Sequence, residues 1–200
     1  MKSQRFMLPV VLMLLSAVAF SQSDLQKSSV TPVPSEAQKS FSTMKSLAGD
    51  WEGPVTTDIP QAMAAKMGAD KIGPIHVSMR VTSRGNALVH ELQEAGTPLD
   101  ATKYDHPVTM LYVDGEQLTL IHYCDAGNRP RMVGKLSADG KTVQFDLLDV
   151  AGSTQYGHMQ SATFTFVDAD HHIEDWVYMQ PGDKPVRAHF DLHKTTTPAL

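Results

Sequence analysis

The chain has 200 residues, of which 42% are hydrophobic and 20% are charged, and its formal net charge at pH 7 is −5. This length is enough to close the hydrophobic core of one domain, and the composition excludes a disordered chain or a collagen-like repeat. A single cysteine excludes an intramolecular disulfide framework. The negative charge argues against non-specific nucleic-acid binding, which needs a basic surface. We therefore expect one globular domain without a nucleic-acid partner.

The first residues, 1–21, have the pattern of a secretory signal peptide. Lys2 and Arg5 give a positive start, an apolar run follows over residues 6–20, and small residues lie at its end. The run is too short for a membrane span, which needs about 20 residues. We therefore expect a periplasmic or secreted protein with no stable membrane insertion after cleavage; an uncleaved anchor is the alternative.

The next segment, residues 22–40, is rich in Ser and ends near two prolines, so it predicts a flexible linker before a domain at 41–195. Ser35 can cap the start of a short helix. A second short helix is predicted at Ile59–Met67, where Pro60 lies in the first turn. This second helix could cover one end of the domain as a lid.

From Ile75 onwards the hydrophobic pattern changes to a period of two. Val77 and Met79 alternate with polar residues, and so do the apolar residues between Val186 and Leu192. Short turns with Gly, Asn or Asp separate the runs, which excludes a parallel sheet because each crossover would need a dozen or more residues. The pattern predicts an all-β fold, an antiparallel up-and-down β-barrel of about eight to ten strands with one or two short N-terminal helices. A β-sandwich is the alternative.

The segment Leu47–Gly53 (LAGDWEG) resembles the opening of the lipocalin-like (calycin) β-barrels, in which a short helix leads into a Gly-x-Trp first strand. In that superfamily the Trp closes one barrel end and packs against a basic side chain of the last strand. The resemblance implies that role for Trp51, with Arg187 as its structural partner.

A second resemblance covers His122–Met132 (HYCDAGNRPRM) and the segment Asp168–Trp176. Both are similar to exported bacterial proteins of unknown function with a lipocalin-like domain. The likeness implies the fold and the export, and it carries no activity.

His122 and Cys124 are the first candidates for a site inside the barrel. They are two residues apart on a predicted strand and share a face with Leu118 and Leu120, so we expect them to line the lumen. An imidazole and a thiolate could ligate haem iron, copper or zinc. The alternative is a hydrogen-bonded histidine beside an inert buried thiol. A Cys/His nucleophile pair is disfavoured because the two side chains would stand roughly parallel, ~7 Å apart.

Polar residues of the next turn are the second candidates. Asn128, Arg129 and Arg131 could face a ligand carboxylate at the barrel mouth, or form an ordinary polar turn. Tyr112, with His122, could offer hydrogen bonds inside the barrel.

Two histidine-rich segments give weaker signals. Nitrobindin-like haem barrels hold iron through a histidine near the C-terminal strands, and position alone would suggest His189 or His193. Their alternation with apolar residues places both on the outer face, so the haem ligand is not transferred. The acidic and histidine-containing run between Asp168 and Asp175 is interpreted as a solvated hairpin.

The function predicted from these observations is the binding of a small apolar or amphipathic ligand in the lumen. The first alternative is a haem- or metal-binding barrel using His122 and Cys124. The second is an enzyme acting on a lumen-bound substrate, for which His122 and Glu91 are nominal acid and base. The chain has no phosphate-binding glycine loop and no G-x-S-x-G nucleophile motif, so no catalytic residue is assigned.

Overall fold

The structure is a computed structural model that describes residues 33–59, 73–100 and 102–196. The predicted signal peptide (1–21) and residues 60–67 of the predicted second helix, with its proposed role as a lid, lie outside these ranges. Within the described ranges no helix has the length and the apolar character that a bilayer span requires.

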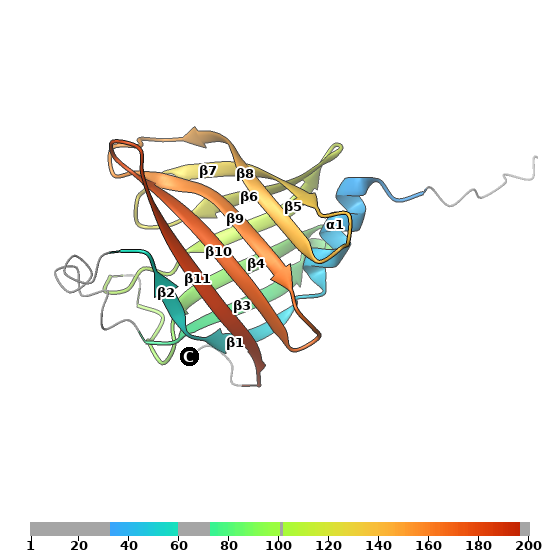
Figure 1. Cartoon of the computed structure of the whole chain (residues 1–200), viewed down its shortest axis with the longest axis horizontal. Helices are drawn as coiled ribbons and strands as arrows, with labels where there is room; N and C mark the ends of the chain where they lie inside the picture. Colours follow the sequence, from blue (N-terminus) through green and yellow to red (C-terminus); the bar gives the residue numbers. More distant parts are fainter. Residues whose placement is uncertain (1–32, 60–72, 101, 197–200) are drawn as a thin grey trace, which may run out of the picture. The chain divides into compact units, whose positions relative to one another are not determined.

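The described chain forms one antiparallel sheet that closes on itself (Figure 1). The strands are β1 (Gly49–Gly53), β2 (Val55–Thr57), β3 (Ile75–Thr82), β4 (Ala87–Glu94), β5 (Val108–Asp114), β6 (Gln117–Tyr123), β7 (Arg129–Leu136), β8 (Thr142–Ala151), β9 (His158–Phe166), β10 (His171–Gln180) and β11 (Lys184–Thr195). Each strand from β3 onward pairs with the next, and β1 pairs with both β3 and β11, which closes a barrel of ten strands. β2 adds to β11 outside this ring. The predicted antiparallel barrel is confirmed.

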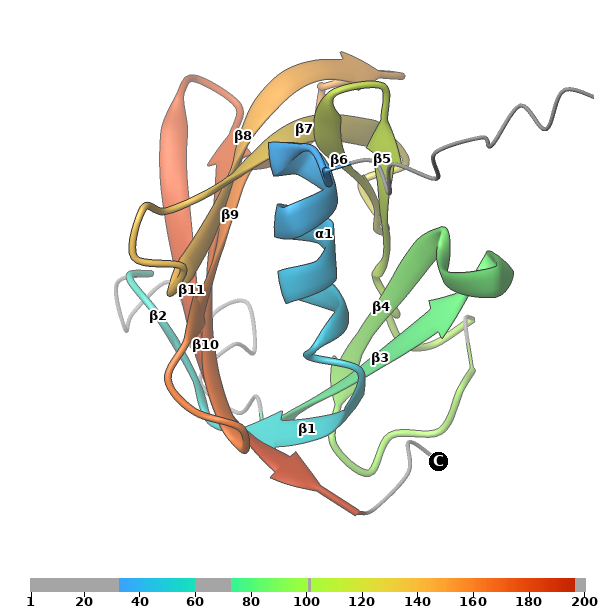
Figure 2. The ribbon, with the colours of Figure 1, turned by 90° about the vertical axis from the view of Figure 1, so that its right-hand side faces the viewer.

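The one helix of the described chain that exceeds a single turn, α1 (Glu36–Lys45), lies across one end of the barrel (Figure 2). Ser35 caps it, because its hydroxyl accepts from the backbone N–H of Gln38 while the Gln38 side chain accepts from the backbone N–H of Ser35. Phe41 and Met44 are buried against the barrel interior. The helix begins at Glu36, inside the segment 22–40 that the sequence predicts as a linker.

Alternation along the strands fills the half of the barrel next to α1. Leu118, Leu120, Phe145 and Phe164 are almost completely buried there. Gly134 lies opposite Phe145, and a Cβ at Gly134 would lie 2.5 Å from the Phe145 ring. The aromatic ring therefore occupies the space that the missing side chain leaves, and this half of the lumen is a packed core.

Trp51 on β1 is a buried member of this core. Its indole is 1% exposed and its Nε1–H donates to the Leu47 carbonyl at 2.8 Å. Its basic partner is Lys194, whose Nζ lies 5.5 Å from the ring centroid, and the expectation of Arg187 is wrong. Even-numbered residues of β11 face inward, and one of them, Lys194, pairs directly with Trp51 on β1. Arg187 has an odd number, so it faces outward, where it forms an ion pair with Asp58.

Candidate functional site

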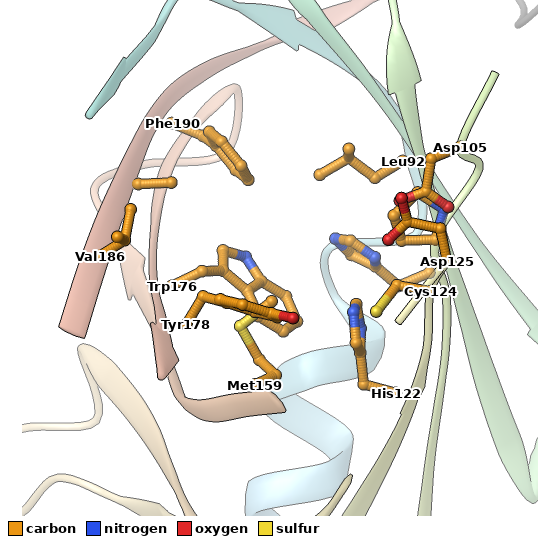
Figure 3. A pocket seen from close by; sticks show the side chains of 13 residues that line it. Leu92, Asp105, His122, Cys124, Asp125, Met159, Trp176, Tyr178, Val186 and Phe190 are labelled. Atoms are coloured by element: carbon orange, nitrogen blue, oxygen red, sulfur yellow. The ribbon is translucent and has the colours of Figure 1, made fainter. Parts of the chain in front are cut away.

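A cavity of about 250 Å³ lies in the other half of the barrel, beyond the end of β6 that is remote from α1. Its walls are mainly apolar. Figure 3 shows residues of β9, β10 and β11 facing residues of β4, β6 and the following loop: Met159, Trp176, Tyr178, Val186 and Phe190 on one side, and Leu92, His122 and Cys124 on the other. The sequence prediction that His122 and Cys124 line the lumen agrees with this placement.

His122 lies at the inner end of the cavity. It is 4% exposed, its Nδ1 lies 2.9 Å from the Thr109 hydroxyl, and its Nε2 is buried without a hydrogen-bond partner among the described residues. Burial and, secondarily, the charge of His90 lower the pKa of His122 to about 4. At neutral pH the ring is therefore uncharged, and one of its nitrogens has no hydrogen-bond partner among the described residues.

A buried carboxylate is hydrogen-bonded to residues that line the cavity. Glu174 on β10 is 0% exposed, and it accepts hydrogen bonds from His90 Nε2 at 3.0 Å, His172 Nε2 at 3.1 Å and Trp176 Nε1 at 2.8 Å. Burial by itself would raise the pKa of Glu174. The positive charge of His90 and the hydrogen bonds outweigh burial, so the pKa lies well below its usual range and the carboxylate is ionised.

This carboxylate fixes the orientation of two rings that line the cavity. Trp176 is tied to it through Nε1, and its ring centroid lies 5.4 Å from that of His122 and 5.7 Å from that of His90. His90 is 2% exposed, and its second nitrogen, Nδ1, is buried without a partner among the described residues. Two histidines that line the cavity, His90 and His122, therefore each have one ring nitrogen without a hydrogen-bond partner among the described residues.

The rim of the cavity is acidic. Asp105 and Asp125 lie beside Cys124, and neither carboxylate forms an ion pair within the described part of the chain. Burial, followed by the charge of Asp125, raises the pKa of Asp105. Burial is also the main cause that raises the pKa of the Cys124 thiol, and both carboxylates add to it. Cys124 therefore remains a neutral thiol, which is a poor nucleophile and a poor metal ligand.

The arginines and the tyrosine predicted to contact a ligand lie on the outer wall, so these expectations are wrong. Arg131 is in register with outward-facing Ile121 and forms an ion pair with Asp149. Arg129, two residues earlier, shares this face and is exposed. Tyr112 alternates with fully buried Leu111, which turns it outward. Strand parity decides all of these positions.

Asn128 is buried, but it has a structural role. Its Nδ2 donates to the carbonyls of Ser153 at 2.9 Å and Gly157 at 2.7 Å, so it joins the loop before β7 to the loop before β9. Its Oδ1 is buried without a hydrogen-bond partner among the described residues, but Asn128 does not line the cavity, so the predicted ligand contact is not supported there.

The nominal acid–base pair of His122 and Glu91 is also wrong. Glu91 lies on the outer wall, where it forms an ion pair with Arg80. His189 and His193 face outward, as the alternation predicted; the His189 imidazole is 46% exposed and lies 2.7 Å from Asp175. The run Asp168–Asp175 is only partly a solvated hairpin, because His172 and Glu174 within it are completely buried.

Sequence reasoning missed His90, Glu174 and Trp176 as parts of the site. On β10 the polar residues His172 and Glu174 face the interior, while Ile173 faces outward, which reverses the usual rule of apolar residues inside. One usable signal was present. Trp176 lies two residues after Glu174, and a strand places both on one face.

The haem alternative does not fit the residues present. The neutral Nε2 of His122 has the chemistry of an iron ligand, but the Cys124 thiol is protonated and the cavity of about 250 Å³ is smaller than a haem group. His122 and Cys124 therefore do not form a site that fits a haem group.

The fold and cavity define this protein as a closed ten-stranded antiparallel barrel with a helix across one end and a small cavity at the other. No protein-family model matches the sequence, and no curated protein matches it. Among solved structures, the barrel is similar to that described as "Crystal Structure of Rv2717c from M. tuberculosis", with a TM-score of 0.53 and 15% identity over 78% of this chain and 97% of that chain. At this identity the similarity shows the fold alone.

Proposed function

We propose that this protein binds one small molecule in the cavity, with an apolar body and a basic or hydrogen-bond-donating end. The observation that carries this proposal is the unpartnered, neutral imidazole of His122 in an otherwise apolar cavity. A buried polar atom without a partner costs about 1–3 kcal/mol, and a ligand that supplies the partner recovers that free energy. The rest of the cavity wall provides the apolar contact.

The size of the cavity limits the ligand. An enclosed apolar space of about 150 Å³ holds a benzene molecule, so the 250 Å³ found here suits a compound of about ten non-hydrogen atoms. Trp176 and Phe190 offer aromatic surfaces on one side of this space. A fatty acid with a long chain is larger than this limit.

The rim determines the charge that the ligand carries. Asp105 and Asp125 favour a ligand that carries an amine or another donor and disfavour one that carries a carboxylate. This reverses the expectation from Arg129 and Arg131, which lie on the outer wall. The chemical class is therefore a small aromatic or aliphatic amine, or a neutral donor of the same size.

Two nearly isosteric probes test this proposal. In an amide NMR titration, 2-phenylethylamine is expected to shift resonances of the cavity walls, and phenylacetate to shift them far less. The Asp105→Asn/Asp125→Asn double variant should lose this preference, and His122→Phe should weaken both probes by removing the polar nitrogen. Arg131→Ala, on the outer wall, is the matched control. Equal binding of amine and acid, or shifts confined to the outer wall, would contradict the proposal.

Native mass spectrometry of protein purified from its own host extends the test to the natural ligand. We expect an added mass equal to that of a compound with about ten non-hydrogen atoms, and this mass should be lost on denaturation. An added mass equal to that of haem would contradict the size argument. Protein of bare mass would leave only weak or transient binding, which the NMR titration detects.

Export and a lipocalin-like relationship belong to the same proposal. Export is supported by the N-terminal pattern of residues 1–21. The lipocalin-like relationship is supported by the helix across one end and by Trp51 packed under Lys194. The intact mass of the protein from an envelope fraction tests the export, since removal of about the first 21 residues is expected.

An enzyme acting on the bound molecule is the second candidate function, and one observation favours it. Glu174 accepts from Nε2 of His90, and Nδ1 of the same ring is unpartnered in the cavity wall. A carboxylate that holds a charged imidazole in this way is the arrangement of a general acid, with Nδ1–H as the proton donor. Conversion of a bound compound by the wild type but not by His90→Gln, with binding retained, is the result that distinguishes an enzyme from a binding protein.

A further inference from the structure

A second cluster of ligating side chains lies on the outer wall, away from the cavity. It comprises His171 at the start of β10, with Asp191 and His193 near the end of β11, and one ligand atom from each lies within 4.8 Å of the other two. His171 Nε2 is 2.6 Å from Asp191 Oδ1, and His193 Nε2 is 3.6 Å from the same oxygen. The two imidazole rings stack with centroids 4.3 Å apart. Both rings therefore direct a nitrogen toward one carboxylate oxygen.

The strand register brings these three residues together. His171 pairs directly with His193 across the β10–β11 ladder, and Asp191 precedes His193 by two residues, which places it on the same face. The ligands therefore stand on regular strands of a closed barrel, and their spacing is fixed by backbone hydrogen bonds.

The backbone of the central ligand is held from its other side as well. The Asp191 N–H donates to the Pro54 carbonyl, and Gly53 packs against the Asp191 carbonyl so closely that a Cβ at Gly53 would lie 1.8 Å from its oxygen. Glu52, next to Gly53 on β1, pairs directly with His193 and adds a further carboxylate on the neighbouring strand. The cluster on β10 and β11 is therefore supported by the neighbouring strand β1.

We propose that His171, Asp191 and His193 form a binding site for a divalent transition-metal ion, with Zn²⁺ as the expected occupant. Two imidazoles and one carboxylate suit zinc, copper or nickel, whereas calcium and magnesium prefer sites made of oxygen alone. Three protein ligands leave a coordination position for water or for another molecule. The imidazoles of His171 and His193 and the Asp191 carboxylate are 22%, 62% and 44% exposed, so an ion reaches the site directly from solvent. This site is independent of the ligand proposed for the cavity.

The test is a calorimetric titration of the whole purified protein with ZnCl₂. One Zn²⁺ per chain is expected, and His193→Ala or Asp191→Asn should weaken binding by at least about tenfold, since even a supporting residue of a metal site contributes that much. The matched control is His189→Ala, which removes a histidine paired with Asp175 on the same two strands but outside the cluster. This control should bind Zn²⁺ like the wild type, and CaCl₂ should give no binding at the site.

NMR of the histidine side chains gives a second readout that does not depend on affinity. Paramagnetic Ni²⁺ should broaden the imidazole signals of His171 and His193 first and leave that of the buried His122 sharp. Absence of Zn²⁺ binding, or binding that survives His193→Ala and disappears with Cys124→Ser, would overturn the proposal. Because all three side chains are partly exposed, these variants should retain the melting temperature of the wild type without metal, and this is measured in parallel.

Discussion

Lowering the pH from 7 to 4 is expected to destabilise this barrel through His122. In the folded protein His122 is buried and its pKa is about 4, while in the unfolded chain its pKa is the ordinary 6.5. Below pH 6.5 the unfolded state therefore binds a proton that the folded state rejects. Stability falls as the pH decreases through this interval, and below pH 4 both states are protonated and this contribution becomes constant.

The magnitude follows from the difference between the two pKa values. One pKa unit corresponds to 1.36 kcal/mol, so a decrease from 6.5 to about 4 corresponds to a loss of about 3 kcal/mol. This is a large part of the 5–15 kcal/mol that is typical for the unfolding of a domain. Its cause is the burial of the ring, with a smaller contribution from the charge of His90.

Urea unfolding at several pH values between 4 and 7.5 measures this contribution, provided that unfolding is two-state. The comparison is with His122→Gln, because glutamine does not titrate and its amide oxygen can accept from the Thr109 hydroxyl. The wild type should lose about 3 kcal/mol more than this variant between pH 7 and pH 4. Thr109→Val is the control, since it removes the hydroxyl but keeps the imidazole, and its stability should still depend on pH. Parallel curves for the wild type and His122→Gln would refute the reasoning.

Three further substitutions test the packing around the site, each by urea or thermal unfolding. Glu174→Gln should destabilise the protein by about 2–3 kcal/mol, because the new NH₂ group would face a buried N–H whose hydrogen bond the carboxylate accepts in the wild type. An unchanged stability would show that water reaches the groups around Glu174. Gly53→Ala should destabilise by at least about 2 kcal/mol, because its Cβ would collide with the Asp191 backbone. Gly134→Ala should cost about 1–3 kcal/mol, and adding Phe145→Leu should recover part of this loss, since the Phe145 ring is the obstacle.

The alternation of side chains along the strands was enough to predict much of this architecture. Val77 and Met79, and the apolar residues between Val186 and Leu192, predicted strands with one buried face, and short turns predicted their antiparallel order. The same parity placed His122 inside the barrel, because it follows Leu118 and Leu120 at intervals of two. These inferences hold because a strand has a fixed period, whatever it packs against.

The polar residues of β10 were not placed by the alternation of apolar residues, because Ile173 lies on the outer face and Trp176 on the inner face. On β10 the buried side is the polar one, so Glu174 was assigned to solvent, although it is completely buried. Its partner His90 is 84 residues away in the sequence. A buried charge is acceptable only where donors from several strands converge, and that convergence is a property of the closed barrel.

Apolar alternation and capping preferences predicted the apolar strand faces, the helix cap at Ser35 and the inward position of His122. Which side chains share a site depends on the closure of the barrel. Closure sets Lys194, and not Arg187, opposite Trp51, and the register between β6 and β7 sets Arg131 beside outward-facing Ile121. Period and propensity are local, whereas a cavity, a buried carboxylate and the grouping of His171, Asp191 and His193 depend on the register between different strands.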